Sequence, residues 1–148
     1  MIEVEKKVSI TNEDDLARLI QGAQFLREVV NDDVLYDSEI FDLTINGLWL
    51  RTRGGVWELK VPIQQKGSRL ATQYDELEDE NAIRNTLHLL TEGSMADAVA
   101  KAGYVPFAKY KTTRQKYSLG DFHIDIDLTD FGQSTFAIGE IELMVNDA

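Results

Sequence analysis

The N-terminal segment is the part of the sequence that most directly indicates the fold. Residues 2–10 have the sequence IEVEKKVSI, in which apolar residues alternate with polar or charged ones. Successive side chains of an extended strand point to opposite faces of a sheet, so Glu3, Glu5 and Lys7 share one face and the aliphatic residues share the other. One such strand is typical of a solvated sheet edge, so the segment alone leaves that possibility open.

The same alternation recurs along the rest of the chain. The later segments place charges on one face and mostly apolar residues on the other, except for 74–79, in which both faces are acidic. A Gly54-Gly55 pair between two of them predicts a hairpin. A sheet with charges of both signs on one face of nearly every strand is expected to close around a charged interior. We therefore predict a closed antiparallel barrel of about eight strands. The later segments are 48–53, 56–61, 74–79, 110–116, 122–128 and 136–145.

Helical patterns separate these strands, so the fold class is α+β with helices packed outside the barrel. Thr11, with Asp14 three residues on, predicts an N-cap. A stripe at helical spacing then extends the first helix to Val30, through Leu16, Leu19, Ile20, Ala23 and Leu26. A second helix is predicted over 81–90. A third is capped by Ser94 and ends near Gly103.

Composition favours one cytoplasmic domain spanning residues 1–148. The net charge of −11 argues against a nucleic-acid or anionic-membrane partner, which would need a basic surface. The chain has no cysteine, which excludes disulfides and cysteine-based zinc sites, and no apolar run long enough for a bilayer. We expect a monomer or weak homodimer that binds a small molecule.

The charged strand faces predict a site for a polyanion and a metal. Arginine and lysine bind phosphate oxygens through charge-assisted hydrogen bonds. The basic set is Arg51, Arg53, Lys60, Arg114 and Lys116. Carboxylates on the same faces would repel phosphate unless a divalent cation lay between them, and hard oxygen ligands suit Mg²⁺ or Mn²⁺. The acidic set is Glu3, Glu5, Asp125, Asp127, Glu140 and Glu142. Together the two sets predict triphosphate chemistry.

The charged elements, taken in order, resemble the CYTH superfamily, the triphosphate tunnel metalloenzymes. They are Glu3-x-Glu5-x-Lys7, Arg51-x-Arg53, Glu58-x-Lys60, Arg114, Asp125-x-Asp127 and Glu140-x-Glu142, and the resemblance covers essentially the whole chain. Within the superfamily the sequence is most similar to thiamine triphosphatases, in the stretches 36–38, 48–53, 57–62, 74–77, 124–127 and 130–132.

The resemblance implies a Mg²⁺-dependent hydrolase that converts thiamine triphosphate to thiamine diphosphate and phosphate. By the same resemblance, the acidic set would hold one or two metal ions, and Lys7, Glu140 and Glu142 would be catalytic. Trp49 would stack on the cationic thiazolium ring. The other substrate-binding residues would be Arg51, Arg53, Lys60, Arg114 and Glu76.

Two departures from the family pattern leave alternatives open. Animal thiamine triphosphatases have a tyrosine pair where this chain has Leu35-Tyr36, so the expected partner of Lys7 is missing. Family members also usually continue past the final strand into a helix with a further tunnel lysine, which this chain would lack. The alternatives are an inorganic triphosphatase, less readily an adenylyl cyclase, a non-catalytic triphosphate-binding module, and a structural domain with a vestigial tunnel.

Overall fold

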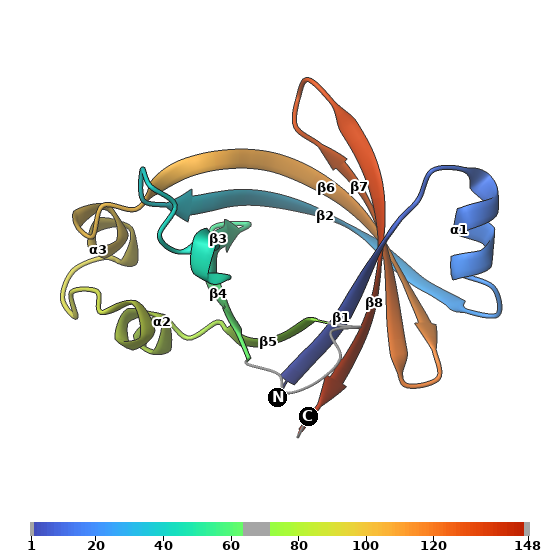
Figure 1. Ribbon diagram of the computed structural model, residues 1–148, viewed down its shortest axis with the longest axis horizontal. Coiled ribbons are helices and arrows are strands. Elements are labelled where there is room, and N and C mark those ends of the chain that lie inside the picture. Colours follow the sequence, from blue (N-terminus) through green and yellow to red (C-terminus); the bar gives the residue numbers. More distant parts are fainter. Residues whose placement is uncertain (1, 64–71, 147–148) are drawn as a thin grey trace. The chain divides into compact units, whose positions relative to one another are not determined.

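The computed structural model describes residues 2–63 and 72–146, and its strands form a closed antiparallel barrel, which confirms the predicted fold class. The strand order around the barrel is β1-β5-β4-β3-β2-β6-β7-β8. The strands are β1 (Ile2–Ser9), β2 (Gln24–Asp37), β3 (Trp49–Arg53), β4 (Val56–Pro62), β5 (Thr72–Leu77), β6 (Val105–Leu119), β7 (Phe122–Asp130) and β8 (Thr135–Val145). The helices are α1 (Glu13–Leu19), the short 3-10 helix η1 (Thr44–Asn46), α2 (Glu80–Leu87) and α3 (Met95–Lys101) (Figure 1).

The chain divides into two compact units. The first unit contains residues 1–31, 64–73 and 110–148, and the second contains residues 32–63 and 74–109. No helix among residues 2–63 and 72–146 is long and apolar enough to span a membrane. The expectation about a helix missing after Ala148 falls outside the described residues.

The first unit is built on β1 and the C-terminal strands. β8 pairs with β1 on one side and with β7 on the other, and β7 continues into a pairing with β6. The register places the predicted acidic and basic site residues of all four strands on one face, as the alternation predicts. On the opposite face of β8, Gly139 leaves room for Leu19 of α1, where a Cβ atom would collide with that side chain.

The second unit carries the main hydrophobic core. β3 and β4 form the predicted Gly54-Gly55 hairpin, in which both glycines have positive φ. The face opposite the charged residues packs against α2 and α3 through the fully buried Leu59 and Ile83. Trp57 lies on this face, 4.8 Å from Tyr36 between ring centroids, and belongs to the hydrophobic core.

The first helix differs from the prediction. Its N-cap is Asn12, whose side chain accepts the Asp15 N–H, while the Thr11 hydroxyl donates to the Asp15 carboxylate. The helix ends at Leu19 because Gly22, at φ 76°, redirects the chain into β2. The extension through Leu26 and Val30 was therefore wrong. Both residues lie in β2 with about half of their surface exposed, so their helical spacing was coincidental.

The other two helices agree more closely with their predictions. α2 begins at Glu80 and ends at Leu87, where His88 adopts a left-handed conformation, so the predicted end at Leu90 was three residues too late. Ser94 caps α3 by accepting the Asp97 N–H, and the chain turns at Gly103 as predicted.

Asp37 organises the loop that follows β2. Its fully buried carboxylate accepts backbone N–H groups from Ser38, Leu43 and Thr44 at 2.8, 3.0 and 2.9 Å. Burial by itself would raise the pKa of this carboxyl, but the hydrogen bonds outweigh burial and hold the pKa below the ordinary value of 3.8.

We predict that Asp37→Asn lowers the free energy of unfolding by about 1–3 kcal/mol at pH 7, because an amide nitrogen cannot accept a hydrogen bond. A depressed carboxyl pKa stabilises the fold above the unfolded-state pKa and loses that effect as pH falls through the folded-state pKa. Urea unfolding should therefore show the difference shrinking below pH 3.8. Asp42→Asn, at an exposed position in the same loop, is the matched control. An equal effect of both substitutions would contradict this account.

Candidate functional site

The charged face of the first unit brings acidic residues from β1, β7 and β8 together. Glu5 lies opposite Glu142 across the β1–β8 pair, and Asp125 lies opposite Glu140 across the β7–β8 pair. Ligand atoms of Glu3, Glu5 and Glu142 lie within 4.8 Å of one another, and so do those of Asp125, Glu140 and Glu142. These five residues are called the acidic group below. Glu142 belongs to both sets, so a cation could be held on either side of it.

Arg114 on β6 neutralises part of this charge. Its Nε and Nη2 donate to the two carboxylate oxygens of Asp127 at 2.7 and 2.6 Å. Nη2 also lies 2.9 Å from Glu140, and Nη1 lies 2.7 Å from Asp125. Burial alone would lower the pKa of Arg114, but these carboxylates raise it well above the ordinary value, so the guanidinium stays charged.

Two lysines complete the positive charge on this face. Lys7 Nζ lies 3.1 Å from Glu140 and 3.4 Å from Glu5, and Lys116 Nζ lies 3.1 Å from Asp125 Oδ2. Burial raises the pKa of Glu140, but Lys7 and Arg114 outweigh it and lower that pKa overall. Among residues 2–63 and 72–146, this face holds six carboxylates, those of the acidic group and Asp127, against three cations, Lys7, Arg114 and Lys116. Within the described part of the chain, negative charge is therefore in excess.

Two carboxylates of the acidic group, Asp125 and Glu142, are incompletely satisfied. Asp125 is fully buried, and its Oδ1 has no hydrogen-bond partner within the described part of the chain. Burial and the charges of Asp125, Glu3 and Glu140 raise the pKa of Glu142 to about 7. A bound divalent cation would give the buried Asp125 oxygen a partner and would offset the like charges that crowd Glu142. The residues present thus fit an oxygen-ligated metal ion.

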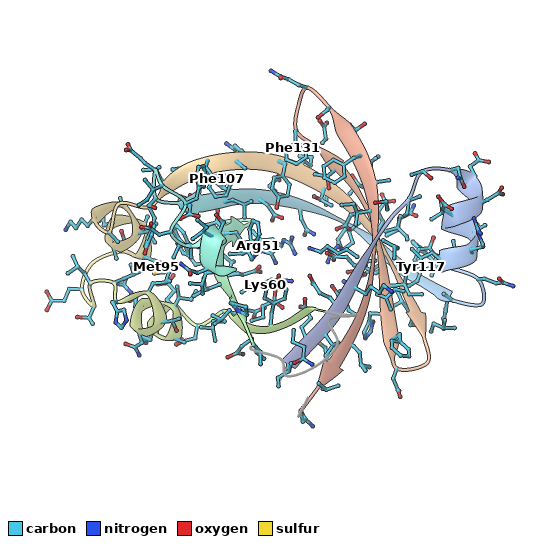
Figure 2. All side chains as sticks on the ribbon, in the orientation of Figure 1. Arg51, Lys60, Met95, Phe107, Tyr117 and Phe131 are labelled. Carbon is cyan, nitrogen blue, oxygen red and sulfur yellow. The ribbon has the colours of Figure 1, made fainter. Side chains whose placement is uncertain are left out.

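The charged face of the second unit carries arginines and a lysine in ion pairs. Arg51 Nε donates to Glu58 at 2.7 Å, and its Nη2 lies 3.4 Å from Glu76. Lys60 Nζ lies 4.0 Å from Glu76 and 5.4 Å from the ring centroid of Tyr74. Figure 2 shows Arg51 and Lys60 beside β3 and β4.

Arg53 and Trp49 belong to the same face. Arg53 forms a bidentate pair with the buried Asp33 of β2, at 2.8 and 2.7 Å. Trp49 lies opposite Lys60 in the β3–β4 pair, and 37% of its surface is exposed. Trp49 therefore lies on the same face of the β3–β4 pair as Arg51 and Arg53.

The structure brings together most of the residues that the sequence singled out, within each unit. Glu3, Glu5, Asp125, Glu140 and Glu142 form the acidic group; Lys7, Lys116 and Arg114 contact its members. Asp127 is in neither three-carboxylate set, and both of its oxygens accept hydrogen bonds from Arg114. His123 lies on the same face, opposite Glu142, and is exposed.

Sequence reasoning missed Asp33 as the partner of Arg53. Because the first helix was predicted to continue through Val30, the strand that contains Asp33 was not predicted. The alternation of Asp33, Leu35 and Asp37 would have indicated it. Leu35 lies opposite Arg51, so it occupies the charged face where the animal thiamine triphosphatases have a tyrosine.

The family model of the CYTH domain matches residues 1–148. The chain belongs to the CYTH family. A search of curated proteins found no match. Among solved structures, the chain is similar to an adenylyl cyclase candidate from Hippeastrum for which a dominant triphosphatase activity is reported. That similarity has 17% identity and a TM-score of 0.59, over 97% of this chain and 80% of the other.

Two further structures show how widely this fold is used. A protein from Pyrococcus horikoshii matches with 19% identity and a TM-score of 0.61, over 98% of this chain and 79% of its own. A chain of the Schizosaccharomyces pombe Mediator head module matches with 15% identity and a TM-score of 0.62, over 100% of this chain and 85% of the other. At these identities the similarity shows the CYTH fold alone, and the activity has to be argued from the site.

We predict that Glu142→Gln stabilises the metal-free protein and abolishes its stabilisation by metal. The pKa of Glu142 is about 7 in the folded protein against about 4.5 as the ordinary value, so wild-type stability falls as pH rises through this range. At pH 8 the substitution should add about 1–3 kcal/mol, because it removes a crowded negative charge.

Thermal melts with and without Mn²⁺ test both parts of this prediction. At 100 times its dissociation constant Mn²⁺ should add about 2.7 kcal/mol to the wild type and much less to Glu142→Gln. Glu39→Gln, an exposed acid in the second unit, is the control for the same chemical change. A variant that is less stable without metal, or that keeps the Mn²⁺ effect, would refute the role given to Glu142.

Proposed function

We propose that this CYTH protein is a metal-dependent triphosphatase that hydrolyses the terminal phosphate of thiamine triphosphate. The observation that carries the proposal is the acidic group, with the unpartnered Asp125 Oδ1 and the charge-crowded Glu142. Membership of a family that includes metal-dependent triphosphatases supports it, as does the activity reported for the Hippeastrum protein.

In this proposal the acidic group holds Mg²⁺ or Mn²⁺. All of its ligand atoms are carboxylate oxygens, which both ions accept. A divalent cation bound there would polarise phosphate oxygens and the attacking water. Asp127 was predicted to be a further ligand; its pairing with Arg114 favours a role in orienting that arginine instead.

The basic residues supply the rest of the charge neutralisation. Arg51, Arg53 and Lys60 would bind phosphate oxygens, and each would exchange part of its present carboxylate contact for the substrate. Arg114, held by Asp125, Asp127 and Glu140, would keep these carboxylates in place and offer its remaining hydrogen-bonding capacity to phosphate. Phosphoryl transfer needs little more than such positioning and charge stabilisation.

Lys7 is the proposed catalytic side chain nearest to the acidic group. Its contacts with Glu5 and Glu140 place a mobile positive charge beside the carboxylates, and 57% of its side chain is exposed. We propose that Lys7 stabilises negative charge that develops on the phosphate oxygens during cleavage. Glu140 would orient Lys7, and Glu140 and Glu142 would position the attacking water. The protein would act as a cytoplasmic monomer or weak homodimer.

We predict that the purified protein releases phosphate from triphosphates with Mg²⁺ present and that EDTA abolishes the release. Asp125→Asn should lower kcat by at least 100-fold, because it removes charge at the proposed metal ligand. Asp97→Asn, an acid in α3, is the control. A colorimetric phosphate assay with thiamine triphosphate, inorganic triphosphate and ATP gives the rates. Tight triphosphate binding without any phosphate release would instead identify a non-catalytic binding module.

Trp49 supports the preference for thiamine. A permanent cation over an indole face gains about 0.5–2 kcal/mol, and Trp49 lies on the face that carries Arg51 and Arg53 with part of its ring exposed. Inorganic triphosphate is the second candidate substrate, and it is favoured by Leu35, which stands on this face where a tyrosine would be expected.

We predict that Trp49→Ala lowers kcat/KM for thiamine triphosphate at least tenfold relative to inorganic triphosphate. Val56→Ala is the matched control, because Val56 is an exposed apolar residue on the same face of the β3–β4 pair. Steady-state kinetics with both substrates give the ratio. Equal losses on the two substrates would remove the stacking role and leave an inorganic triphosphatase as the better assignment.

A further inference from the structure

We propose that Tyr110, Phe131 and Phe136 form a subsite for the planar ring of an organic triphosphate. These three residues are called the aromatic cluster below. The inference rests on the proposed triphosphatase function and deepens it, since it assigns a second ring-binding element besides Trp49 and names the substrate class as ring-bearing triphosphates.

The aromatic cluster is a continuous set of ring contacts at one end of the β6–β7–β8 sheet, tilted between Tyr110 and Phe131 and stacked between Phe131 and Phe136. The ring centroids of Tyr110 and Phe131 are 5.1 Å apart, and those of Phe131 and Phe136 are 5.5 Å apart with an interplanar angle of 19°. Figure 2 shows Phe131 beside β6 and β7. All three residues belong to the first unit.

The strand register places the cluster on the charged face. Phe136 lies opposite Thr129, and Thr112 lies opposite the same Thr129 from the other side. Two residues further along these strands come Arg114 and Asp127, which are themselves a cross-strand pair. Tyr110 precedes Thr112 by two residues and so has the parity of Arg114. The aromatic cluster and the acidic group are thus on one face.

The spacing along the strands suits a ligand with a charged end and a ring. Phe136 and Glu140 are four residues apart on β8, or about 13 Å at the rise of an extended strand. Between the aromatic cluster and the charges lie Thr112 and Thr129, whose hydroxyl oxygens are 3.3 Å apart and buried. A triphosphate anchored at the acidic group and extending along this face would bring its organic end to the aromatic cluster.

The rings remain accessible although they are stacked. Phe131 has 42% of its surface exposed and Phe136 has 43%, so each keeps surface that a further ring could cover. Aromatic rings stack with offset or parallel geometry, and a base stacked on an aromatic side chain typically gains about tenfold or more in affinity. Phe25 and Tyr117 form another aromatic pair in this unit, 5.4 Å apart, but Tyr117 points to the opposite face of β6 from Arg114.

This difference between the faces provides the test. Phe136→Leu keeps an apolar side chain in the hairpin but removes the flat ring, and Phe25→Leu makes the same change in the aromatic pair of Tyr117. We measure KM and kcat for thiamine triphosphate, ATP and inorganic triphosphate with Mg²⁺, and the melting temperature of each variant. Binding of ATP and of inorganic triphosphate with Mg²⁺ is measured in parallel by calorimetry.

Phe136→Leu should raise KM for one or both organic triphosphates about tenfold relative to inorganic triphosphate, while Phe25→Leu should leave this ratio unchanged. A change confined to ATP assigns the subsite to a purine, and one confined to thiamine triphosphate assigns it to the thiamine rings. If the ratio of KM for organic triphosphates to KM for inorganic triphosphate is unchanged in Phe136→Leu, or changes equally in Phe136→Leu and Phe25→Leu, the proposal is overturned. The aromatic cluster then only packs the hairpin.

The calorimetry separates this proposal from the proposed function. If the wild type binds ATP and triphosphate but releases no phosphate, the triphosphatase assignment fails, and a selective loss of ATP binding in Phe136→Leu still supports the subsite. If the wild type binds inorganic triphosphate but not ATP, and does not hydrolyse thiamine triphosphate, the subsite is wrong while the inorganic activity stands. Binding of neither ligand, together with no release of phosphate from thiamine triphosphate, overturns both.

Discussion

Arg114 connects Asp125, Asp127 and Glu140, and the rest of the first unit depends on this arrangement. Burying several carboxylates on one sheet face is unfavourable unless their charge is balanced, since a charge removed from water costs several kcal/mol. The guanidinium balances part of the charge through a bidentate pair with Asp127 and contacts with the other two residues. Arg114 leaves one buried oxygen of Asp125 without a hydrogen-bond partner and does not prevent the raised pKa of Glu142. These two unsatisfied carboxylates indicate a bound cation.

The strands of the second unit show the same alternation, with paired charges on one face and the hydrophobic core on the other. Each basic side chain described on its charged face contacts a carboxylate, as Arg53 contacts Asp33, and Arg51 and Lys60 share Glu76. The opposite face is mostly apolar and packs against α2 and α3. The hydrophobic core therefore provides stability, while residues on the charged face can exchange their partners for a ligand. Core packing and ligand binding can lie on opposite faces of the same strands, because successive side chains of a strand point to opposite sides.

Much of this could be predicted from the sequence because strand parity is a strict geometric rule. Glu3 and Glu5, or Glu140 and Glu142, share a face of their own strand whatever the surrounding structure. The observed register then places Glu5 opposite Glu142 and Arg114 opposite Asp127. The helix through Val30 was wrong because helical spacing does not record where the backbone turns, which Gly22 decides. The ion pair of Asp33 with Arg53 was missed because the predicted helix left the strand of Asp33 unrecognised. The stack of Phe131 on Phe136 could not be predicted, because it depends on which strand ends meet.

The most direct test of the central claim is a crystal of this protein grown with Mn²⁺ and a non-hydrolysable triphosphate, measured at a wavelength where manganese scatters anomalously. The account predicts an anomalous peak in contact with Glu142 and with carboxylates of Asp125 and Glu140 or of Glu3 and Glu5. Phosphate oxygens should lie on the same ion. Triphosphate density without an anomalous peak at the acidic group, or manganese bound only elsewhere on the protein, would contradict it.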